Sequence, residues 1–347
     1  MNFTTSLRDS YAGAPLPLHL ITPLDFRSIE ALPASHRWPD PPGPDQSEQP
    51  VPLVSLGSPQ AAKILNHACR EWGVFQLTGH DISLGLLEDV VCHARRLFEL
   101  PLAVKTRALR SASGGTGYGM ARMSRFFDKF MWHEGFTIMD CCSLGQDARA
   151  LWPQDYIPFC DTIQKYQNKM KKLCQLITQL ILDSLGLSPT DFVEWSNPGT
   201  ASTALQLNYY PPCPDPAHAM GLAPHTDTLS FTVLHQDRCA GGLEILKGGT
   251  GWVPAAPLAR GALVVILGDL VHILSNGAYA SVVHRARVPE TGDRISVAYF
   301  YGPSMDLEIT PVAVEGEEQR FRSVTVKDYV KLKEKYFNDA LSQLAAS

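Results

Sequence analysis

Two histidines and one aspartate in the second half of the chain could bind a metal ion. His225 and Asp227 are separated by one residue at the start of a β-like run, and residues i and i+2 of an extended chain point to the same side. His284 follows 57 residues after Asp227, in the strand-like run SVVHRARV. Two imidazoles and one carboxylate can occupy one face of an octahedron and leave about three positions open, which is typical of non-haem Fe(II) sites. We therefore predict that His225, Asp227 and His284 are metal ligands.

Arg294 and Ser296 could hold a second ligand beside this metal. They follow His284 by ten and twelve residues and, again at i and i+2, share one face of a strand. An arginine binds a carboxylate through two parallel hydrogen bonds, and a neighbouring hydroxyl group can donate a third. A dicarboxylate whose keto-acid end chelates the metal needs such an anchor at its other end. The pair argues against a zinc hydrolase, because a hydrolase has no use for a dicarboxylate anchor.

Other histidines and acidic residues could compete for the metal. Asp269 and His272 lie together in GDLVHIL, and His235 lies two residues before Asp237. Because Gly268 and Asp269 follow the apolar run ALVVIL, we interpret Asp269 as a turn residue. We interpret His235 and His272 as packed or surface histidines rather than ligands.

The composition is that of an ordinary globular protein. The 347 residues are 45% hydrophobic and 19% charged, enough for one large domain or two smaller ones. The net charge of -5 and the pI of about 6.1 give no indication of nucleic-acid binding. No run approaches the roughly 18 apolar residues of a membrane span, and the first residues do not resemble a signal peptide. We expect a cytoplasmic protein whose eight cysteines, none in a C-x-x-C pair, are reduced thiols.

Three regions of the chain differ in their sequence pattern. Residues 1–50 hold nine of the 26 prolines and form either an irregular arm around the domain or a disordered lead. Residues 51–200 carry helical periodicity, and residues 201–347 contain short β-branched or aromatic runs before a last helix that begins near Thr325. Helices in the middle region are expected near 59–72, 84–98 and 159–185. The expected fold class is α+β, with a jelly-roll core (a double-stranded β-helix), an N-terminal helical region and a C-terminal helix.

Several segments together resemble the plant 2-oxoglutarate/Fe(II)-dependent dioxygenases, over roughly residues 51–345. CREWGVFQLTGH (69–80) and LFELPLAVK (97–105) are similar to the N-terminal region of that family. Its catalytic jelly roll is similar to LNYYPPCP (207–214), GLAPHTD (221–227), GDLVHILSNG (268–277), SVVHRARV (281–288) and RISVAYFYGP (294–303). Within the family, the greatest similarity is to the gibberellin 3-beta-hydroxylases, through GYGMARMSRFFDKFMWHEGFTI (117–138) and the ending FRSVTVKDYVKLKEKYFNDALSQL (321–344).

This resemblance implies a reaction, its cofactors and the residues that bind them. The implied reaction is hydroxylation of a gibberellin at the 3-beta position with Fe(II), 2-oxoglutarate and O2, supported by ascorbate. The implied catalytic iron ligands are His225, Asp227 and His284, and the implied 2-oxoglutarate anchors are Arg294, Ser296 and Tyr210, with Asn208 nearby on the same strand face. Three alternatives remain open: 2-beta-hydroxylation, another apolar acid or a flavonoid as substrate, and a non-catalytic jelly-roll hormone binder that would release no succinate.

The substrate pocket should be largely apolar with a few fixed polar groups, because a gibberellin is a rigid apolar polycycle that carries a carboxylate. Its predicted walls are Met123, Phe126, Phe127 and Phe300. The substrate carboxylate could meet Arg122, Arg125 or Lys129, and the sequence does not choose among them. His133 stands where the family segment usually has a small polar residue, so it could alter the choice of substrate.

Overall fold

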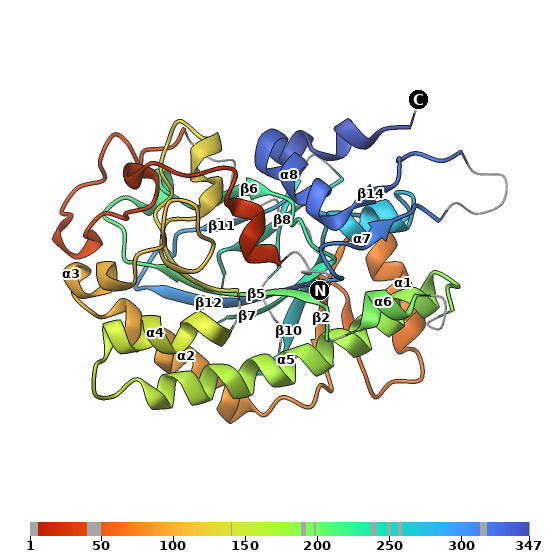
Figure 1. The fold of residues 1–347 in the computed structure, drawn as a ribbon, viewed down its shortest axis with the longest axis horizontal. Helices are drawn as coiled ribbons and strands as arrows, with labels where there is room; N and C mark the ends of the chain where they lie inside the picture. Colours follow the sequence, from red (N-terminus) through yellow and green to blue (C-terminus); the bar gives the residue numbers. More distant parts are fainter. Residues whose placement is uncertain are drawn as a thin grey trace, which may run out of the picture.

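Two β-sheets packed against each other form the centre of the molecule (Figure 1). The computed structural model describes residues 6–39, 50–139, 141–188, 192–197, 199–236, 241–248, 251–255, 259–312 and 318–346. The large sheet has the strand order β1 (Leu53–Ser55), β2 (Val74–Thr78), β10 (Leu263–Leu267), β7 (Phe231–Gln236), β12 (Arg294–Gly302), β5 (Ser202–Tyr210), β4 (Glu134–Ile138), β3 (Gly117–Gly119). The small sheet has the order β6 (Met220–His225), β11 (His284–Arg287), β8 (Leu243–Lys247), β9 (Gly251–Pro254), and β13 (Glu308–Ile309) pairs separately with β14 (Val324–Thr325). The predicted jelly-roll core is confirmed.

Helices cover the large sheet on one side, and the last helix lies on the other side of the molecule (Figure 1). The α-helices are α1 (Ala61–Glu71), α2 (Leu84–Phe98), α3 (Leu102–Lys105), α4 (Cys141–Leu151), α5 (Ile157–Ser184), α6 (Val193–Ser196), α7 (Asp269–Leu274) and α8 (Val326–Tyr336). The 3-10 turns are η1 (Leu7–Tyr11), η2 (Leu18–Leu20), η3 (Phe26–Ser28), η4 (Thr106–Ala108), η5 (Arg122–Phe126), η6 (Pro216–His218), η7 (Phe337–Asp339) and η8 (Leu341–Leu344). The helices predicted near 59–72, 84–98 and 159–185 are therefore confirmed as α1, α2 and α5.

The long helix α5 is held by the apolar stripe that its sequence predicts. Ile163, Met170 and Ile177 are fully buried along one face, spaced seven residues apart as a helix requires. At a rise of about 1.5 Å per residue the helix is about 42 Å long, so it can run beneath the sheet as Figure 1 shows. In the part of the chain that the structure describes, neither α5 nor any other helix is long and apolar enough to cross a membrane.

Alternation along β12 separates the two faces of the large sheet. Val297 and Tyr299 belong to the core under the helices, whereas Ser296, Ala298 and Phe300 line the space between the two sheets. The same alternation therefore gives one strand a helix-facing side of large apolar residues and an inner side that can carry polar groups.

The Pro-rich N-terminal arm lies against the domain over residues 6–39. Leu7, Leu16, Ile21 and Phe26 are buried, and η1 packs against α8. Ser6 caps η1 by accepting a hydrogen bond from the backbone of Asp9. Residues 40–49, where the proline cluster lies, fall outside the described residues.

Asp269 differs from its sequence interpretation, because it begins helix α7 instead of lying in a turn. Its side chain is fully buried, and Lys333, Tyr329 and Ser281 all donate hydrogen bonds to its carboxylate. These partners come from distant segments, so local sequence preference for a turn did not decide the backbone here.

Candidate metal centre and adjoining pocket

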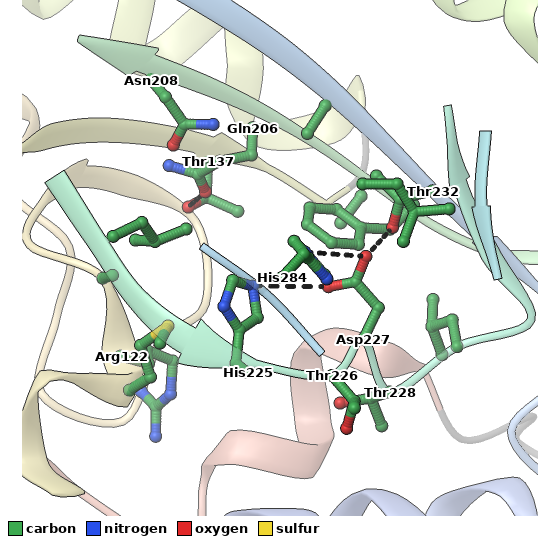
Figure 2. Close-up of a pocket in the computed structure, with 18 of the residues that line it drawn as sticks. Arg122, Thr137, Gln206, Asn208, His225, Thr226, Asp227, Thr228, Thr232 and His284 are labelled. Atoms are coloured by element: carbon green, nitrogen blue, oxygen red, sulfur yellow. Dashed lines mark hydrogen bonds and ion pairs between the residues drawn. The ribbon is translucent and has the colours of Figure 1, made fainter. Parts of the chain in front are cut away.

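The predicted metal ligands meet at the edge of the small sheet. His225 is the last residue of β6, His284 is the first of β11, and the two are paired across these strands. Asp227 follows β6 by two residues. One potential ligand atom from each of the three residues lies within 4.8 Å of the other two (Figure 2). Among the described residues this is the one such group of three; His235 and His272 are not part of it, and Asp237 lies outside those residues.

The chemistry of the three ligand atoms suits a cation. Nδ1 of His225 is 2.8 Å from the carbonyl oxygen of Ala223, and Nδ1 of His284 is 3.2 Å from that of Val282. A carbonyl only accepts, so each Nδ1 carries the proton and each Nε2 offers a lone pair. The two Nε2 atoms lie 3.7 and 3.8 Å from the Asp227 carboxylate oxygens, too far for hydrogen bonds. Three electron-rich atoms thus converge without a proton between them. They repel one another, and a bound divalent metal ion would offset this repulsion.

Burial supports the neutral form of the imidazole at this centre. Loss of contact with water is the main cause that lowers the pKa of His225 to about 3, and the charge of the neighbouring His284 is the second cause. His225 is therefore neutral near pH 7, as a metal ligand must be. Thr232 on β7 donates a hydrogen bond to Oδ2 of Asp227 and fixes the plane of that carboxylate (Figure 2).

A buried hydrogen-bond network holds the backbone between His225, at the end of β6, and Asp227. Asp269 forms a 2.7 Å ion pair with Lys333 of α8, and Lys333 also donates a hydrogen bond to the hydroxyl oxygen of Thr226. The backbone N–H of Asp269 donates to the carbonyl of Asp227 at 2.8 Å. Asn338 accepts from the Thr226 N–H at 3.3 Å and donates to the carbonyl of the preceding Pro224. Helix α8 and the following turn η7 thus hold the segment that carries the predicted metal ligands His225 and Asp227.

The predicted anchor residues form one polar patch on two paired strands. In the β12–β5 register, Arg294 lies opposite Tyr210 and Ser296 opposite Asn208. The guanidinium of Arg294 lies 4.7 Å from the Tyr210 ring centre and donates to Gln236 at 2.8 Å. Its Nε and Nη1 are buried and have no partner among the described residues. A carboxylate would fit here, because its two oxygens can accept hydrogen bonds from both free donors of this guanidinium.

One cavity of about 260 Å3 connects the metal centre with this patch. Met123, Phe126 and Phe300 line it, as the sequence predicts. Phe127 is not among its lining residues; its ring instead packs edge-on against Phe337, at 5.5 Å between centres, and Phe337 lines the cavity. The walls of the cavity are therefore mostly apolar around the polar groups that converge on it.

The candidate partners for a substrate carboxylate lie in different places. Arg122 lines the cavity and, in Figure 2, lies on the side of His225 away from Asp227. Arg125 is not in the cavity wall and contacts Glu334 of α8 at 3.0 Å. Lys129 donates to the carbonyl of Ala34 at 3.0 Å and is not among the residues that line the cavity. Of the three, only Arg122 can reach a ligand in this cavity.

Sequence reasoning missed Gln236, Thr232 and Arg110, and it left the contacts of His133 open. Gln236 on β7 contacts Arg294 on the paired strand β12, and Thr232 donates to Asp227 from the first turn of chain after it; the sequence does not show which strands pair. His133, noted only as a departure from the family, contacts Asn208 at 2.8 Å through Nε2. Burial lowers its pKa to about 4, so it is neutral near pH 7. A further cavity residue, Arg110, went unnoticed because it lies in an irregular Ser/Gly-rich loop.

Comparison with known proteins identifies the family to which this chain belongs. Residues 201–303 match the model of the 2OG-Fe(II) oxygenase superfamily, and residues 51–155 match that of the non-haem dioxygenase in morphine synthesis N-terminal region. Gibberellin 3-beta-dioxygenase 1 of Arabidopsis thaliana is 43% identical over 97% of this chain and 97% of its own length. The chain belongs to the 2-oxoglutarate/Fe(II)-dependent dioxygenases. Gibberellin 3-beta-dioxygenase 1 of Pisum sativum is 45% identical to this dioxygenase over 98% of this chain and 93% of its own length.

Solved structures share the fold of this dioxygenase. JOX2, in complex with 2OG, Fe and JA, is 25% identical with a TM-score of 0.80 and covers 92% of this chain and 95% of its own. The rice dioxygenase for auxin oxidation is 28% identical with a TM-score of 0.69, covering 85% of this chain and all of its own. Together these matches confirm the family and the predicted use of Fe(II) and 2-oxoglutarate.

Proposed function

We propose that this dioxygenase hydroxylates a gibberellin at its 3-beta position. The observation that carries the proposal is the similarity of 43% and 45% to two gibberellin 3-beta-dioxygenases over nearly the whole chain. The cavity supports it, because apolar walls from Met123, Phe126 and Phe300 suit a rigid apolar ring system. The reaction at C-3 would give the bioactive form of the hormone.

We assign the iron ligands to His225, Asp227 and His284. The support is the convergence of their three electron-rich atoms and the backbone contacts that orient both imidazoles. When bound there, Fe(II) supplies the activation of O2 that the side chains of a protein cannot supply themselves. Thr232 restrains the Asp227 carboxylate, so that this carboxylate would keep its orientation toward a bound ion.

We assign the distal carboxylate of 2-oxoglutarate to Arg294 and Ser296, with Tyr210 and Asn208 beside them. The free donors of Arg294 support this assignment. Asn208 donates toward the hydroxyl oxygen of Ser296 at 3.4 Å, which leaves the hydroxyl proton to point at a ligand. The Tyr210 ring lies against the guanidinium and limits its rotation. The co-substrate is thereby held with its keto-acid end toward the metal ligands.

A product assay tests the proposal. The purified protein is incubated with Fe(II), ascorbate, 2-oxoglutarate and a panel of gibberellins, and products are identified by mass spectrometry. We expect a 3-beta-hydroxylated gibberellin together with one succinate for each hydroxylation. Hydroxylation at C-2 alone, or of flavonoids alone, would refute the proposal, and ligand binding without succinate would indicate the non-catalytic binder.

A further inference from the structure

The buried cations of this dioxygenase fall into two groups. Five Lys or Arg side chains in the described residues are buried. Three of them contact a carboxylate: Lys105 with Glu134, Arg285 with Glu244, and Lys333 with Asp269. The other two, Arg294 and Arg110, have no ion-pair partner among the described residues, and both line the one cavity of the metal centre. A buried charge without a counter-charge is costly, so each of these two calls for an anion from outside the chain.

The setting of Arg110 resembles that of the co-substrate anchor. Its side chain is only 4% exposed, and Nη2 donates to the carbonyl of Met120 at 2.7 Å. Its Nε is buried and has no partner among the described residues. Burial, followed by the charge of Arg122, lowers its pKa to about 10, so the group stays charged near pH 7. The free donor and the retained charge make Arg110 suited to bind an anion.

The surroundings of Arg110 carry a surplus of positive charge. Residues 100–127 contain five Lys or Arg and no Asp or Glu. Glu334 of α8 also lines the cavity, and it forms ion pairs with Arg122 at 3.2 Å and with Arg125 at 3.0 Å. Arg122 also keeps a buried Nε without a partner among the described residues. One carboxylate thus pairs with two guanidinium groups, and Arg110 is left without an ion pair among the described residues.

This second anion position is separate from that of 2-oxoglutarate. Arg110 lies over β3, because a Cβ added to Gly119 would lie 3.7 Å from its Nη2. From there the sheet register runs from Gly119 to Gly135, to Asn208 and to Ser296. Gly119 and Ser296 are thus three strand spacings apart, about 14 Å along the sheet, so Arg110 and Ser296 enter the cavity over strands that are not neighbours.

We propose that Arg110, assisted by Arg122, binds the carboxylate of the organic substrate. The inference rests on the proposed function and deepens it, because a gibberellin brings one carboxylate on an otherwise apolar body. Arg110 shares this cavity with the apolar side chains of Met123 and Phe126, which suit the ring system, and with the proposed metal ligands. The carboxylate fixes which carbon faces the metal, so Arg110 determines specificity by orientation.

The test compares a free acid with its methyl ester. The probe is the gibberellin that the product assay identifies, and binding to the full chain with Fe(II) and 2-oxoglutarate is measured by calorimetry without oxygen. The wild-type protein should bind the acid far more tightly than the ester. Arg110→Gln should weaken binding of the acid about ten- to a hundredfold, the effect of losing one charge-assisted contact. Binding of the ester should change much less, so the acid-to-ester ratio collapses.

Matched variants separate this effect from general loss of charge or structure. Arg107→Gln removes an exposed arginine three residues away and should keep the wild-type ratio. Arg110→Lys keeps the charge but lacks the forked donors, so it should retain only part of the preference for the acid. If Arg110→Gln does not fold, a several-fold lower ratio in Arg110→Lys supports the proposal, and an unchanged ratio overturns it.

Two results would overturn the subsite directly: wild-type protein that binds the ester as tightly as the acid, or Arg110→Gln that keeps the wild-type ratio. Failure of the proposed function is a different result. If the protein binds a gibberellin of the panel without hydroxylating it, the comparison is made with that gibberellin and its methyl ester. A collapse of its ratio in Arg110→Gln would still support the carboxylate subsite.

Discussion

The buried ion pair between Lys333 and Asp269 gives the sharpest test of how α8 supports the metal centre. We consider Lys333→Met, which keeps the length and apolar stem of the side chain and removes the charge. Asp269 is fully buried and Lys333 is 7% exposed, so the variant leaves a carboxylate without its cation in the interior. Breaking such a pair from one side typically costs about 3–5 kcal/mol of folding free energy.

The remaining contacts of Asp269 set where in this range the cost falls. Tyr329 and Ser281 still donate hydrogen bonds to it, at 2.7 and 2.6 Å, and these favour the charged carboxylate. We therefore expect the low end, about 3 kcal/mol, when unfolding is followed in urea. Changing both residues, in Asp269→Asn with Lys333→Met, should recover part of the loss, because the unpaired charge is then gone.

Lys331→Met is the matched control on the same helix. Its ion pair with Asp328 is 2.9 Å long, but the two side chains are 65% and 52% exposed. Such a surface pair contributes about 0–1 kcal/mol, so the control should unfold almost as the wild type does. If Lys333→Met lost no more stability than Lys331→Met, the buried network would not support the fold as argued.

The same variant should also weaken iron binding. Thr226 lies between two of the proposed ligands and receives a hydrogen bond from Lys333, while Asp269 holds the carbonyl of Asp227. Loss of an outer contact of this kind commonly lowers metal affinity about tenfold or more. A titration with Fe(II) under nitrogen measures it, and an unaltered dissociation constant would show that α8 does not position the ligands.

Three further predictions concern iron binding, 2-oxoglutarate binding and stability at acidic pH. Asp227→Ala should abolish turnover and weaken iron binding while the circular dichroism spectrum stays native; retained activity would remove Asp227 from the ligand set. Arg294→Ala should raise the KM for 2-oxoglutarate about thirty- to a hundredfold and that for the organic substrate far less, and equal rises would place the anchor elsewhere. Stability should fall between about pH 6.5 and pH 4, because burial lowers the pKa of His133 to about 4 and the folded state binds fewer protons than the unfolded chain. His133→Gln should reduce this fall by up to about 3 kcal/mol at pH 4, and an unchanged slope of unfolding free energy against pH would contradict it.

Periodicity and spacing predicted much of the fold and part of the candidate site. The seven-residue recurrence of Ile163, Met170 and Ile177 predicted α5, since burial on one helical face follows from spacing alone. The i, i+2 spacing of Arg294 and Ser296 correctly predicted that both face the same space, because alternation is intrinsic to a strand. Both patterns are local, so no knowledge of neighbouring segments was needed.

Contacts between distant segments were not predictable in this way. Gln236 reaches Arg294, 58 residues away along the chain, because β7 pairs with β12. Alternation tells which face a residue occupies but not which strand lies beside it. Asp269 was misjudged for the same reason, since its partners come from α8 and from Ser281. The sequence does contain an indication for Arg110, because residues 100–127 include five Lys or Arg and no Asp or Glu. This pattern becomes visible only when charges are counted over the whole segment.

The N-terminal arm has a practical consequence for anyone who handles this enzyme. Leu7 and Tyr11 of η1 are part of the cavity wall, and the Tyr11 ring lies 4.4 Å from the Arg122 guanidinium. Both residues precede the two stretches, 51–155 and 201–303, that match known families. Expressing only the matched stretches would remove one wall of the cavity and open it to water. The ligand range of this dioxygenase is therefore best measured on protein that keeps its first dozen residues.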